Sequence, residues 1–472
     1  MDSLDISTDM ETRMGRRRAV AFALLAIVQS TLIFTIALIM IPLPIIAEGF
    51  ALTEAEVLLL QVSYGLPFSG LLLFGGRLTD RYGTRRMFVL GLVLFGAASL
   101  GAALTPGYAA LTILRAVQGV GGAMVAPAAL GLVRGLHPDP AGFGRAMAVW
   151  GGVSVLGAVL GFITSGMVAE FVNWRWMFAV PIAVSLLGLA GCAGLLPATG
   201  RAVAGPEATR PGLDLPGALL ATSGIALASF GLIASNDAGW GSILTVGPLA
   251  AGAVLLLAFV LAERRRRDPL LPPDFLCNPL RLAGLGGVLL AAAISVLIEY
   301  ALLVYLQQTR GWTPFETAAS FLPFAVALIG TNSIAAAIVG RIGAERTMAA
   351  GFLTAALGLA ALAFLEPGTD YPTVLLPAQI LVAVGIALVF AGAAVLSMAH
   401  VPPWQMGLAG GVMNTAMELG PTVGFSLLMA VAATAADSVA GYARAFGTAA
   451  ATYTLFALIA LAIAGRRGRA PE

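Results

Sequence analysis

The chain of 472 residues contains no lysine, and all of its basic charge comes from 26 arginines. Charged residues of both signs make up only 11% of the sequence, whereas hydrophobic residues make up 59% and the mean hydropathy is +0.93. Soluble domains do not have this balance. The composition therefore excludes a soluble globular protein and predicts an integral membrane protein that crosses the bilayer many times.

Residues that commonly carry chemistry are also scarce, because the chain has only two cysteines and two histidines. Cys192 falls in an apolar run and Cys277 in a polar connector, which gives neither a disulfide pair nor the spacing of a metal site. The sequence has no Ser/His/Asp arrangement and no Walker glycine loop. We therefore expect no enzyme activity, no bound metal and no cofactor, and the lack of a basic patch with interleaved aromatic residues argues against a nucleic-acid partner.

Long apolar runs fill most of the sequence. About 20 apolar residues cross a bilayer as a helix, so the runs predict an all-α integral membrane protein with fourteen transmembrane helices. The predicted spans are residues 19–46, 55–75, 87–105, 109–133, 146–169, 176–197, 215–235, 243–262, 282–306, 315–340, 347–365, 372–398, 405–433 and 445–464. The first run is longer than the core of a signal peptide, so we expect it to be retained.

The arginines predict the orientation of these spans. They cluster in the N-terminal tail, in residues 76–86, in residues 264–267 and at the C-terminus, whereas the predicted outer loops hold only Arg175, Arg310 and Arg444. The positive-inside rule then places both termini in the cytoplasm. The absence of lysine, together with frequent alanine and glycine, suggests a bacterial genome rich in GC, so the expected location is a bacterial inner membrane.

Two segments of the chain resemble each other and suggest an internal duplication. The string from Gly157 to Phe162 is similar to that from Gly420 to Phe425, and each has glycines at i and i+4 (Gly157 and Gly161; Gly420 and Gly424) where helices can approach closely. We expect two six-helix bundles, at 19–199 and 282–465, between terminal tails at 1–18 and 466–472. Residues 200–262 would form two inserted helices and residues 263–281 a cytoplasmic connector. A chance match between glycine-rich helices is the alternative.

A compact charged segment lies between the second and third predicted spans. Gly76 would let helix ends approach and Gly83 would supply a backbone angle that other residues avoid. Asp80 alternates with arginines in a pattern that allows ion pairs to form in one conformation and break in another. Such exposed pairs are worth only about 0–1 kcal/mol each. We expect this loop to act as a cytoplasmic latch, although the arginines there would also serve to set the topology. Its conspicuous members are Gly76, Leu78, Asp80, Arg81, Gly83, Arg85 and Arg86.

The same segment resembles motif A of the major facilitator superfamily, and residues 111–122 are similar to the motif B of that superfamily. Residues 173–178, 263–275 and 305–314 resemble the fourteen-helix drug:proton antiporter family, so the resemblance covers essentially the whole chain. It implies a major facilitator fold and proton-driven export of amphipathic drugs, antibiotics or secondary metabolites by alternating access. Its partners would be a small-molecule substrate, protons and the lipid bilayer, with the proton motive force as the energy source, and we expect a monomer.

Arg115 is the one arginine placed within a predicted span, where charge costs roughly 2.5–3.5 kcal/mol at a helix centre. We expect it to face the protein interior, with Gln118 on nearly the same face and Gly119 beside it. By resemblance, the arginine of motif B helps to organise the movement of substrate and protons. The alternative is that Arg115 reaches the outer lipid headgroups.

Two carboxylates, Glu299 and Glu418, fall within predicted spans and are the candidates for proton coupling. A proton-driven exporter needs a group that is neutral in one state and charged in another. A structural role beside a neighbouring helix is the alternative for both. Glu418 stands where the family more often has glutamine, and the first span lacks the carboxylate that members commonly carry. In the second half, residues 340–346 resemble motif A but lack its aspartate, and Pro421 has no counterpart at Ala158.

Aromatic and polar side chains in the spans are candidates for the wall of a substrate cavity, and ordinary helix packing or lipid contact is the alternative for each. These candidates are Tyr64, Phe68, Tyr300, Phe324 and Asn414. The leading functional prediction is thus a proton-driven exporter. The alternatives are a transporter of small metabolites without strict proton coupling and a membrane scaffold or sensor that kept the fold.

Overall fold

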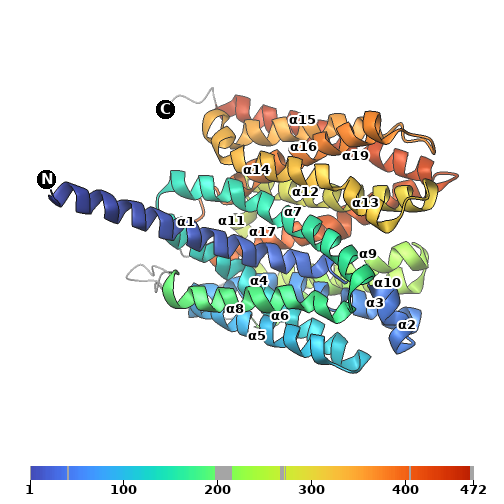
Figure 1. Cartoon of the computed structure of the whole chain (residues 1–472), viewed down its shortest axis with the longest axis horizontal. Helices are drawn as coiled ribbons and strands as arrows, with labels where there is room; N and C mark the ends of the chain where they lie inside the picture. Colours follow the sequence, from blue (N-terminus) through green and yellow to red (C-terminus); the bar gives the residue numbers. More distant parts are fainter. Residues whose placement is uncertain are drawn as a thin grey trace.

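The computed structural model describes residues 2–39, 42–196, 215–265, 271, 273–402 and 405–467, and the described residues form helices and their connections, with no strand among them. The helices run side by side along the length of the molecule (Figure 1). Helix α1 begins and helix α19 ends at the same end of the bundle, which we call the terminal end; the other is the opposite end.

The first half of the chain forms one group of packed helices, in which α1 lies against α7 and α8 while α6 lies between α4 and α5. Its elements are α1 (Asp2–Ala37), α2 (Leu43–Phe50), α3 (Glu54–Val62), α4 (Gly65–Tyr82), α5 (Thr84–Leu104), α6 (Tyr108–Leu136), α7 (Pro140–Phe171), the 3₁₀ turn η1 (Trp174–Phe178) and α8 (Ala179–Gly194).

The second half forms a matching group, in which α16 packs between α12, α14 and α15, and α15 also contacts α19. Its elements are α12 (Pro279–Val304), η2 (Tyr305–Thr309), α13 (Pro314–Ser320), α14 (Leu322–Ile342), α15 (Ala344–Leu362), η3 (Tyr371–Leu375), α16 (Leu376–Ser397), α17 (Met406–Leu419), η5 (Gly420–Gly424), α18 (Phe425–Ala432) and α19 (Ser438–Arg467). The turns η2, η3 and η5 are π-helical.

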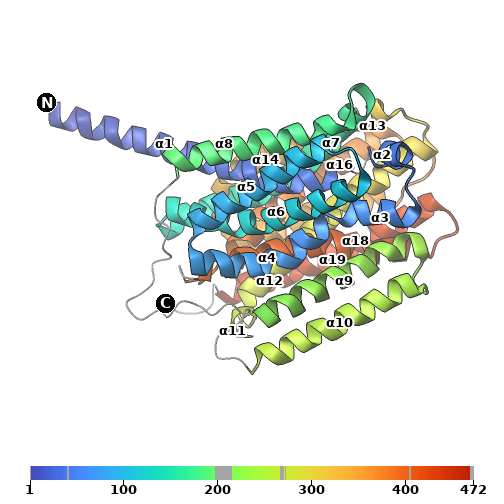
Figure 2. The ribbon, with the colours of Figure 1, turned by 90° about the horizontal axis from the view of Figure 1, so that it is seen from below.

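Between the halves, α9 (Leu215–Ala238) and α10 (Ile243–Glu263) form a hairpin on the outside of the molecule, followed by the short α11 (Pro273–Leu276). Figure 2 shows the hairpin along one side of the bundle, with α10 outermost. Helix α9 contacts α4 of the first half and α18 of the second, whereas α10 packs mainly on α9. The inserted pair is therefore peripheral, and α9 bridges the two halves.

The two halves meet along two seams. At one seam α4 and α6 contact α17, and at the other α7 contacts α14 and α16. Each of these contacts joins helices that are far apart in the sequence. Relative movement of the halves would therefore change the helix contacts at these seams.

Every predicted span overlaps a helix, and eleven helices in the described part of the chain are long and apolar enough to cross a membrane. Helices α7, α9 and α15, which correspond to three further predicted spans, are not among the eleven. The all-helical architecture is as the sequence predicted. The number of fourteen spans stays a prediction.

The first span differs from the prediction, which ran the helix to residue 46. Helix α1 ends at Ala37, and α2 starts at Leu43 with Pro42 in the capping position. Proline lacks an amide hydrogen and disfavours helix in the residue before it, so the chain breaks here. The second predicted span, residues 55–75, covers two helices and not one: the short α3 and the first part of α4.

The sequence predicted a loop over residues 76–86, but the structure places almost all of this segment in helices. Helix α4 continues to Tyr82 and α5 begins at Thr84, so Gly83 alone separates them, with φ of 97°. Gly343 separates α14 from α15 in the same way, with φ of 86°. Both angles lie in the left-handed region that favours glycine. These reversals therefore depend on single glycines.

The local structure before these reversals also recurs. Thr53 and Glu56 form a reciprocal capping box at the start of α3, and Thr313 and Glu316 make the same hydrogen bonds at the start of α13. Thr313 and Glu316 each lie 260 positions after Thr53 and Glu56 (313 − 53 and 316 − 56). Gly343 also lies 260 positions after Gly83 (343 − 83). A constant offset across 31 positions, from 53 to 83 inclusive, is what an internal duplication produces.

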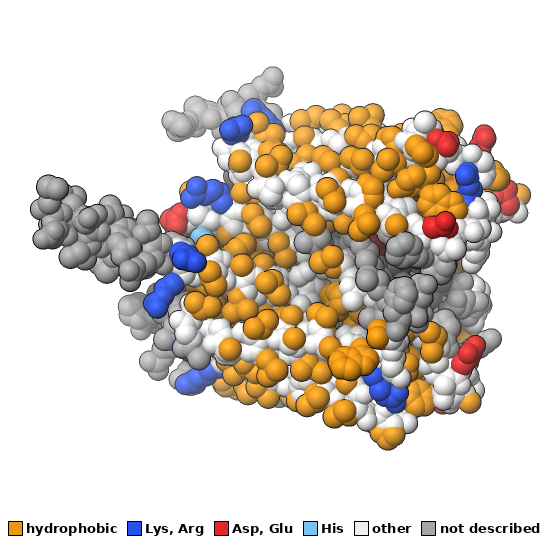
Figure 3. Space-filling view, viewed as in Figure 1, with side chains coloured by type: hydrophobic (Ala, Val, Ile, Leu, Met, Phe, Trp, Pro, Cys, Tyr) orange, Lys and Arg blue, Asp and Glu red, His pale blue; other side chains and the backbone are white. Residues whose placement is uncertain are grey.

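The molecular surface fits a membrane protein. Figure 3 shows hydrophobic side chains along the length of the helices, with arginines gathered at the terminal end and most acidic side chains at the opposite end. Large apolar side chains of several helices are well exposed, for example Ile113 of α6 at 64% and Leu257 of α10 at 60%. Lipid tails would cover such a surface.

Candidate functional site

The two halves touch at the terminal end through Asp80. One carboxylate oxygen of Asp80 accepts a hydrogen bond from the amide of Gly407 at 2.9 Å, and the other accepts one from the amide of Leu408 at 3.0 Å. Both amides belong to the first turn of α17, where backbone N–H groups lack partners within the helix. A carboxylate is favoured at this position because the N-terminus of a helix carries partial positive charge.

Close backbone packing allows this contact to form. A Cβ atom at Gly76 would lie 2.5 Å from the carbonyl oxygen of Gly407, and one at Gly411 would lie 2.7 Å from the carbonyl oxygen of Leu72. Such distances are too short for any side chain. Helices α4 and α17 therefore touch through their backbones at Gly76, within α4, and at Gly407 in the first turn of α17.

The arginines of the 76–86 segment point in several directions. Arg85 donates a hydrogen bond to the carbonyl oxygen of Cys192 near the end of α8, and the guanidinium of Arg81 lies 5.7 Å from the ring of Tyr82. Arg86 is exposed at the start of α5. The sequence suggested that Asp80 would interact with arginines of its own segment, and Arg77 does lie within electrostatic range of it. The two oxygen atoms of Asp80 also accept hydrogen bonds from α17 in the other half, which the sequence did not predict.

A polar centre lies deeper between the helices, around Arg115. Its side chain is fully buried and donates to the carbonyl oxygen of Thr35 at 3.4 Å, and its guanidinium lies 5.3 Å from the centre of the Tyr64 ring. Within the described part of the chain, its Nε and second terminal nitrogen have no hydrogen-bond partner. Arg115 thus faces the interior rather than the headgroups.

Neighbouring residues fix this centre to the first half. The hydroxyl of Tyr64 donates to the carbonyl oxygen of Leu32 at 2.9 Å, and the amide of Gln118 donates to the Ser99 hydroxyl at 2.7 Å. Gly119 lies against the backbone of Tyr64, with no room for a Cβ atom. Helices α1, α4, α5 and α6 are therefore held together by polar contacts around Arg115.

Gln29 links the halves at the level of the membrane. Its amide donates to the side-chain oxygen of Asn414 at 2.9 Å, and Asn414 in turn donates to the carbonyl oxygen of Gly410 at 2.8 Å. Both side chains are fully buried. The sequence prediction included Asn414 but missed Gln29, whose only signal was a single amide within an apolar helix.

The two candidate carboxylates lie on different helices of the second half. Glu299 on α12 is 5% exposed, and its Oε1 has no hydrogen-bond partner among the described residues. Glu418, near the end of α17, is half-buried and lies within electrostatic range of the Tyr64 hydroxyl. Glu418 therefore lies within electrostatic range of one member of the polar centre, Tyr64.

The glycine pairs found in the sequence occupy points of close contact. Gly420 packs on the backbone of Leu289 in α12, and Gly424 on Ala293. Gly157 packs on the backbone of Ser30 in α1, and Gly161 is buried in α7. Pro421 lies in the π-helical turn η5, where the regular hydrogen-bond pattern changes.

The aromatic candidates divide into two groups. Tyr64, Phe68 and Phe324 are fully buried, and the rings of Tyr64 and Phe68 stack with their centres 5.6 Å apart. Tyr300 is 40% exposed and lines a cavity at the opposite end. In this conformation the first three pack in the core and only Tyr300 is open to a ligand.

Comparison with known proteins agrees with this geometry. Residues 22–425 match the model of the Major Facilitator Superfamily. The chain belongs to that superfamily. It is therefore a transporter of the multi-span membrane class and not an enzyme, as the sequence predicted; membership of the fourteen-helix subfamily stays a prediction.

Curated relatives of similar length carry names from antibiotic resistance and export. The puromycin resistance protein of Streptomyces alboniger is 36% identical over 460 residues, covering 92% of this chain and 88% of the relative. The cephamycin export protein of Amycolatopsis lactamdurans is 33% identical, covering 84% and 82%. The lincomycin resistance protein of Streptomyces lincolnensis is 32% identical, covering 89% and 86%.

Solved structures agree on the fold. The human organic anion transporter MFSD10 superposes with a TM-score of 0.65 at 17% identity, covering 94% of this chain and 99% of that one. The proton:xylose symporter XylE gives the same TM-score at 15% identity, covering 94% and 96%. At this identity the likeness concerns the arrangement of helices and not the cargo.

Proposed function

We propose that the protein is a secondary active exporter of an amphipathic compound, such as an antibiotic or secondary metabolite, driven by proton entry and working by alternating access. Relatives that cover most of the chain are named for resistance to or export of puromycin, cephamycin and lincomycin. These compounds differ in structure, so the names support a class of cargo and not one molecule.

The observation that carries this proposal is the contact of Asp80 with the first turn of α17. It joins the halves at the terminal end through two hydrogen bonds between a side chain and backbone amides. Because neither bond belongs to the internal packing of one half, both can break while each half stays folded. Opening of this contact would expose the polar centre to the terminal side.

Glu418 and Glu299 are the proposed carriers of the proton. Both lie in helices of the second half that are long and apolar enough to cross a membrane, and Glu418 lies within electrostatic range of Tyr64 in the polar centre. Protonation would remove a charge that is costly within the membrane and would ease the return of the empty carrier. Each proton that enters supplies about 2.3 kcal/mol per 100 mV of membrane potential.

We also propose a location in the bacterial inner membrane, with the terminal end in the cytoplasm. The gathering of arginines at that end supports this orientation (Figure 3). Export would then carry the cargo from the terminal end to the opposite end.

The test is transport by the purified protein in liposomes with an imposed pH gradient, with radiolabelled puromycin, cephamycin and lincomycin as separate cargoes. We expect at least one cargo to move faster with the gradient than without it, in the direction opposite to the proton. Gradient-independent movement of every transported cargo would refute proton coupling. Failure to move any of them, with the helical content intact, would argue against drug export.

A further inference from the structure

The side chain of Gln379 in α16 is fully buried, yet neither of its polar atoms forms a hydrogen bond with any residue that the structure describes. Buried side-chain amides are almost always hydrogen-bonded, because burial removes their bonds to water and costs free energy when nothing replaces them. The oxygen of an amide accepts hydrogen bonds and its nitrogen donates them. Gln379 is therefore available to bind a group that changes between forms of the protein.

Helix α16 corresponds to α6 of the first half. Helices α5 and α6 touch at two glycines, because a Cβ atom on Gly121 would lie 2.8 Å from the carbonyl oxygen of Gly91. Helices α15 and α16 touch in the same way, since a Cβ atom on Gly385 would lie 2.6 Å from the carbonyl oxygen of Gly351. Gly351 lies 260 positions after Gly91 (351 − 91), which is the offset of the capping boxes. Gly121 and Gly385 are therefore matching points of the two halves.

Gln379 occupies the position in α16 that Arg115 occupies in α6. Arg115 lies six residues before Gly121 (121 − 115), and Gln379 lies six residues before Gly385 (385 − 379). Both side chains are fully buried. Their chemistry differs, because a guanidinium is always charged and only donates hydrogen bonds, whereas an amide is neutral and also accepts them. An arginine can thus bind only the ionised form of a carboxyl group, and a glutamine can bind both forms.

Helix α12 runs antiparallel to α16 and packs against it. At the terminal end, a Cβ atom on Gly284 near the start of α12 would lie against the backbone nitrogen of Ser397, the last residue of α16. At the opposite end, the hydroxyl of Tyr305, directly after α12, donates to the carbonyl oxygen of Glu366 at 2.7 Å. Glu366 comes before η3, which leads into α16. The two helices therefore lie together at both ends.

The count of helical turns from Ser397 places Gln379 at the level of Glu299. An α-helix has 3.6 residues per turn, so 18 residues make about five turns. Gln379 lies 18 residues before Ser397 (397 − 379), and Leu302 lies 18 residues after Gly284 (302 − 284). Each faces the same way as the residue from which it is counted, so Gln379 and Leu302 lie opposite each other. Glu299 is the neighbour of Leu302 on the surface of α12, because residues three apart adjoin.

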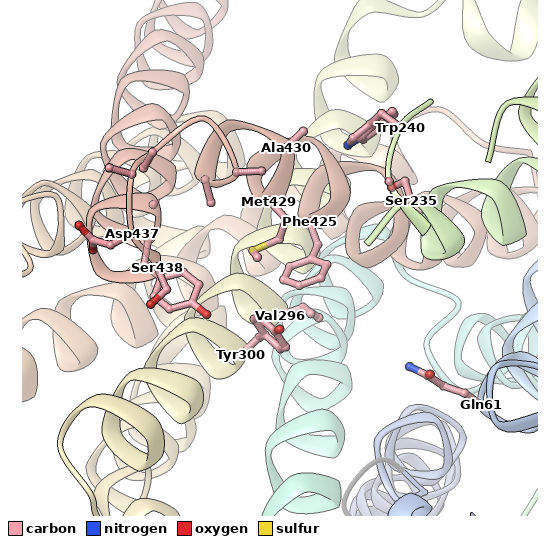
Figure 4. Close-up of a pocket in the computed structure, with 17 residues that line it drawn as sticks. Gln61, Ser235, Trp240, Val296, Tyr300, Phe425, Met429, Ala430, Asp437 and Ser438 are labelled. Atoms are coloured by element: carbon pink, nitrogen blue, oxygen red, sulfur yellow. The ribbon is translucent and has the colours of Figure 1, made fainter. Parts of the chain in front are cut away.

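Glu299 also lies beside a cavity of about 700 Å³ at the opposite end. Val296 and Tyr300 of α12 belong to its wall (Figure 4), which also includes exposed residues such as Asp437. Because residues three apart adjoin on a helix, Glu299 lies between Val296 on the cavity side and Leu302 on the side of α16. A proton that enters the cavity can therefore reach Glu299.

Few titratable side chains approach Glu299 from the described helices that pack against α12. Helices α16 and α18 have none in their sequences. Glu418 of α17 lies two residues before Gly420, whose packing partner Leu289 is ten positions before Glu299 (299 − 289). Helix α19 contributes two hydroxyl groups toward α12, those of Tyr442 and Tyr453. Gln379 is thus the polar side chain of α16 best placed to bind Glu299.

We propose that Gln379 is the positioning residue for a proton carried by Glu299. The protonated carboxyl of Glu299 donates a hydrogen bond to the oxygen Oε1 of Gln379, and the ionised carboxylate accepts one from the nitrogen Nε2. A half-turn of the amide follows each change of protonation. The proton enters from solution through the cavity and returns to solution at the terminal end. This inference rests on the proposed proton-driven export and adds the residue that orients the carrier.

The test is infrared difference spectroscopy of the full-length protein in lipid nanodiscs, recorded between acidic and alkaline buffers. We expect a carbonyl stretching band of a protonated carboxyl group that Glu299→Gln removes. Gln379→Met keeps the length of the side chain but removes its hydrogen bonds, so it should shift this band to higher frequency, because a hydrogen bond weakens the carbonyl bond. The melting temperature should not fall, since an apolar side chain replaces a buried amide that has no partner among the described residues.

Asn332→Leu is the matched control. Asn332 is also a buried amide of the second half, and its oxygen has no partner among the described residues, but it belongs to α14, which packs against α7, α15 and α16. This variant should leave the band of Glu299 unchanged.

A band that stays in place in Gln379→Met, or that shifts equally in Asn332→Leu, would overturn the role of Gln379. If that result came with intact gradient-driven export of puromycin, cephamycin or lincomycin, the proposed function would stand. If Glu299→Gln removed no band, both this inference and the assignment of the proton to Glu299 would fail.

Discussion

Asp80 and Gly407 are 327 positions apart in the chain, yet the carboxylate of one accepts a hydrogen bond from the amide of the other at 2.9 Å. Because Asp80 belongs to the first half and Gly407 to the second, this bond joins the parts that alternating access would separate. Its strength therefore affects the balance between the closed and open forms of the terminal end.

Asp80→Asn should slow transport about tenfold, because a carboxylate at a helix N-terminus is worth up to about 2 kcal/mol and the amide keeps the shape but not the charge. Initial rates of gradient-driven transport in liposomes would measure this effect. The helical content should stay the same, since the packing within each half is untouched.

Glu345→Gln is the matched control for that variant. Glu345 lies in the first turn of α15, after the corresponding glycine reversal of the second half, where the sequence has no counterpart of Asp80. The transport rate of Glu345→Gln should stay close to that of the unmodified protein. Comparable losses in Asp80→Asn and Glu345→Gln would refute the idea that the first-half contact is the dominant latch.

Gly76→Ala should also impair transport, because the new methyl group would lie 2.5 Å from the carbonyl oxygen of Gly407. Overpacking of this kind typically costs about 1–3 kcal/mol. The methyl group would force α4 away from α17 and favour the open terminal end. Cysteine-labelling rates at that end, together with transport rates, would show the shift.

Gly340→Ala provides the comparison, since a methyl group at Gly340 in α14 meets no atom within 4 Å. We expect the same labelling and transport rates as in the unmodified protein, and equal or slightly higher stability because alanine favours helix over glycine. A similar loss in both variants would mean that helix propensity, and not the contact with Gly407, causes the defect.

The sequence predicted Asp80 as part of a latch but could not predict its partner. Motif A is a local pattern, whereas the first turn of α17 reaches Asp80 only after both halves fold and pack. The prediction of a loop over residues 76–86 was wrong because Gly83 alone makes the reversal, with φ of 97°. The starts of α3 and α13 do carry a local signal, a Thr-x-x-Glu capping box at Thr53 and at Thr313, which the sequence analysis did not use.

Arg115 shows the same division between local and tertiary information. Its position within an apolar run predicted an interior location, and the structure buries it completely. The contacts with Thr35 of α1 and with the ring of Tyr64, just before α4, are not indicated by any spacing in the sequence of α6. Gln29 was missed because an isolated amide acquires meaning only when Asn414 lies opposite it.

Glu418→Gln and Glu299→Gln test proton coupling. If either carboxylate carries the proton, its amide should abolish the acceleration by a pH gradient while exchange of labelled for unlabelled cargo continues. Glu366→Gln, which changes an exposed carboxylate beyond α15, should keep the acceleration. Full coupling in the double variant Glu299→Gln, Glu418→Gln would remove both residues from the mechanism.

The bond between Gln29 and Asn414 is the last contact to consider, because it joins the halves within the membrane and not at its surface. Hydrogen bonds between membrane helices are worth about 0.6 kcal/mol on average and at most about 1.7. Gln29→Leu should therefore loosen the closed form modestly and change the transport rate severalfold. A double-mutant cycle with Asn414→Leu would isolate the pair, and the two changes should be less than additive.

A hydrogen bond within one half provides a control that distinguishes an effect on overall stability from an effect on the change between the two forms. Tyr453 of α19 donates to the carbonyl oxygen of Leu290 in α12 at 3.0 Å, and both helices belong to the second half. Tyr453→Phe should lower the melting temperature by an amount similar to Gln29→Leu but leave the transport rate unchanged. Because the halves move as units in alternating access, only bonds that cross between them bias the two forms. If Tyr453→Phe slowed transport as much as Gln29→Leu, the rate would follow overall stability, and the pair of Gln29 and Asn414 would have no special part in switching.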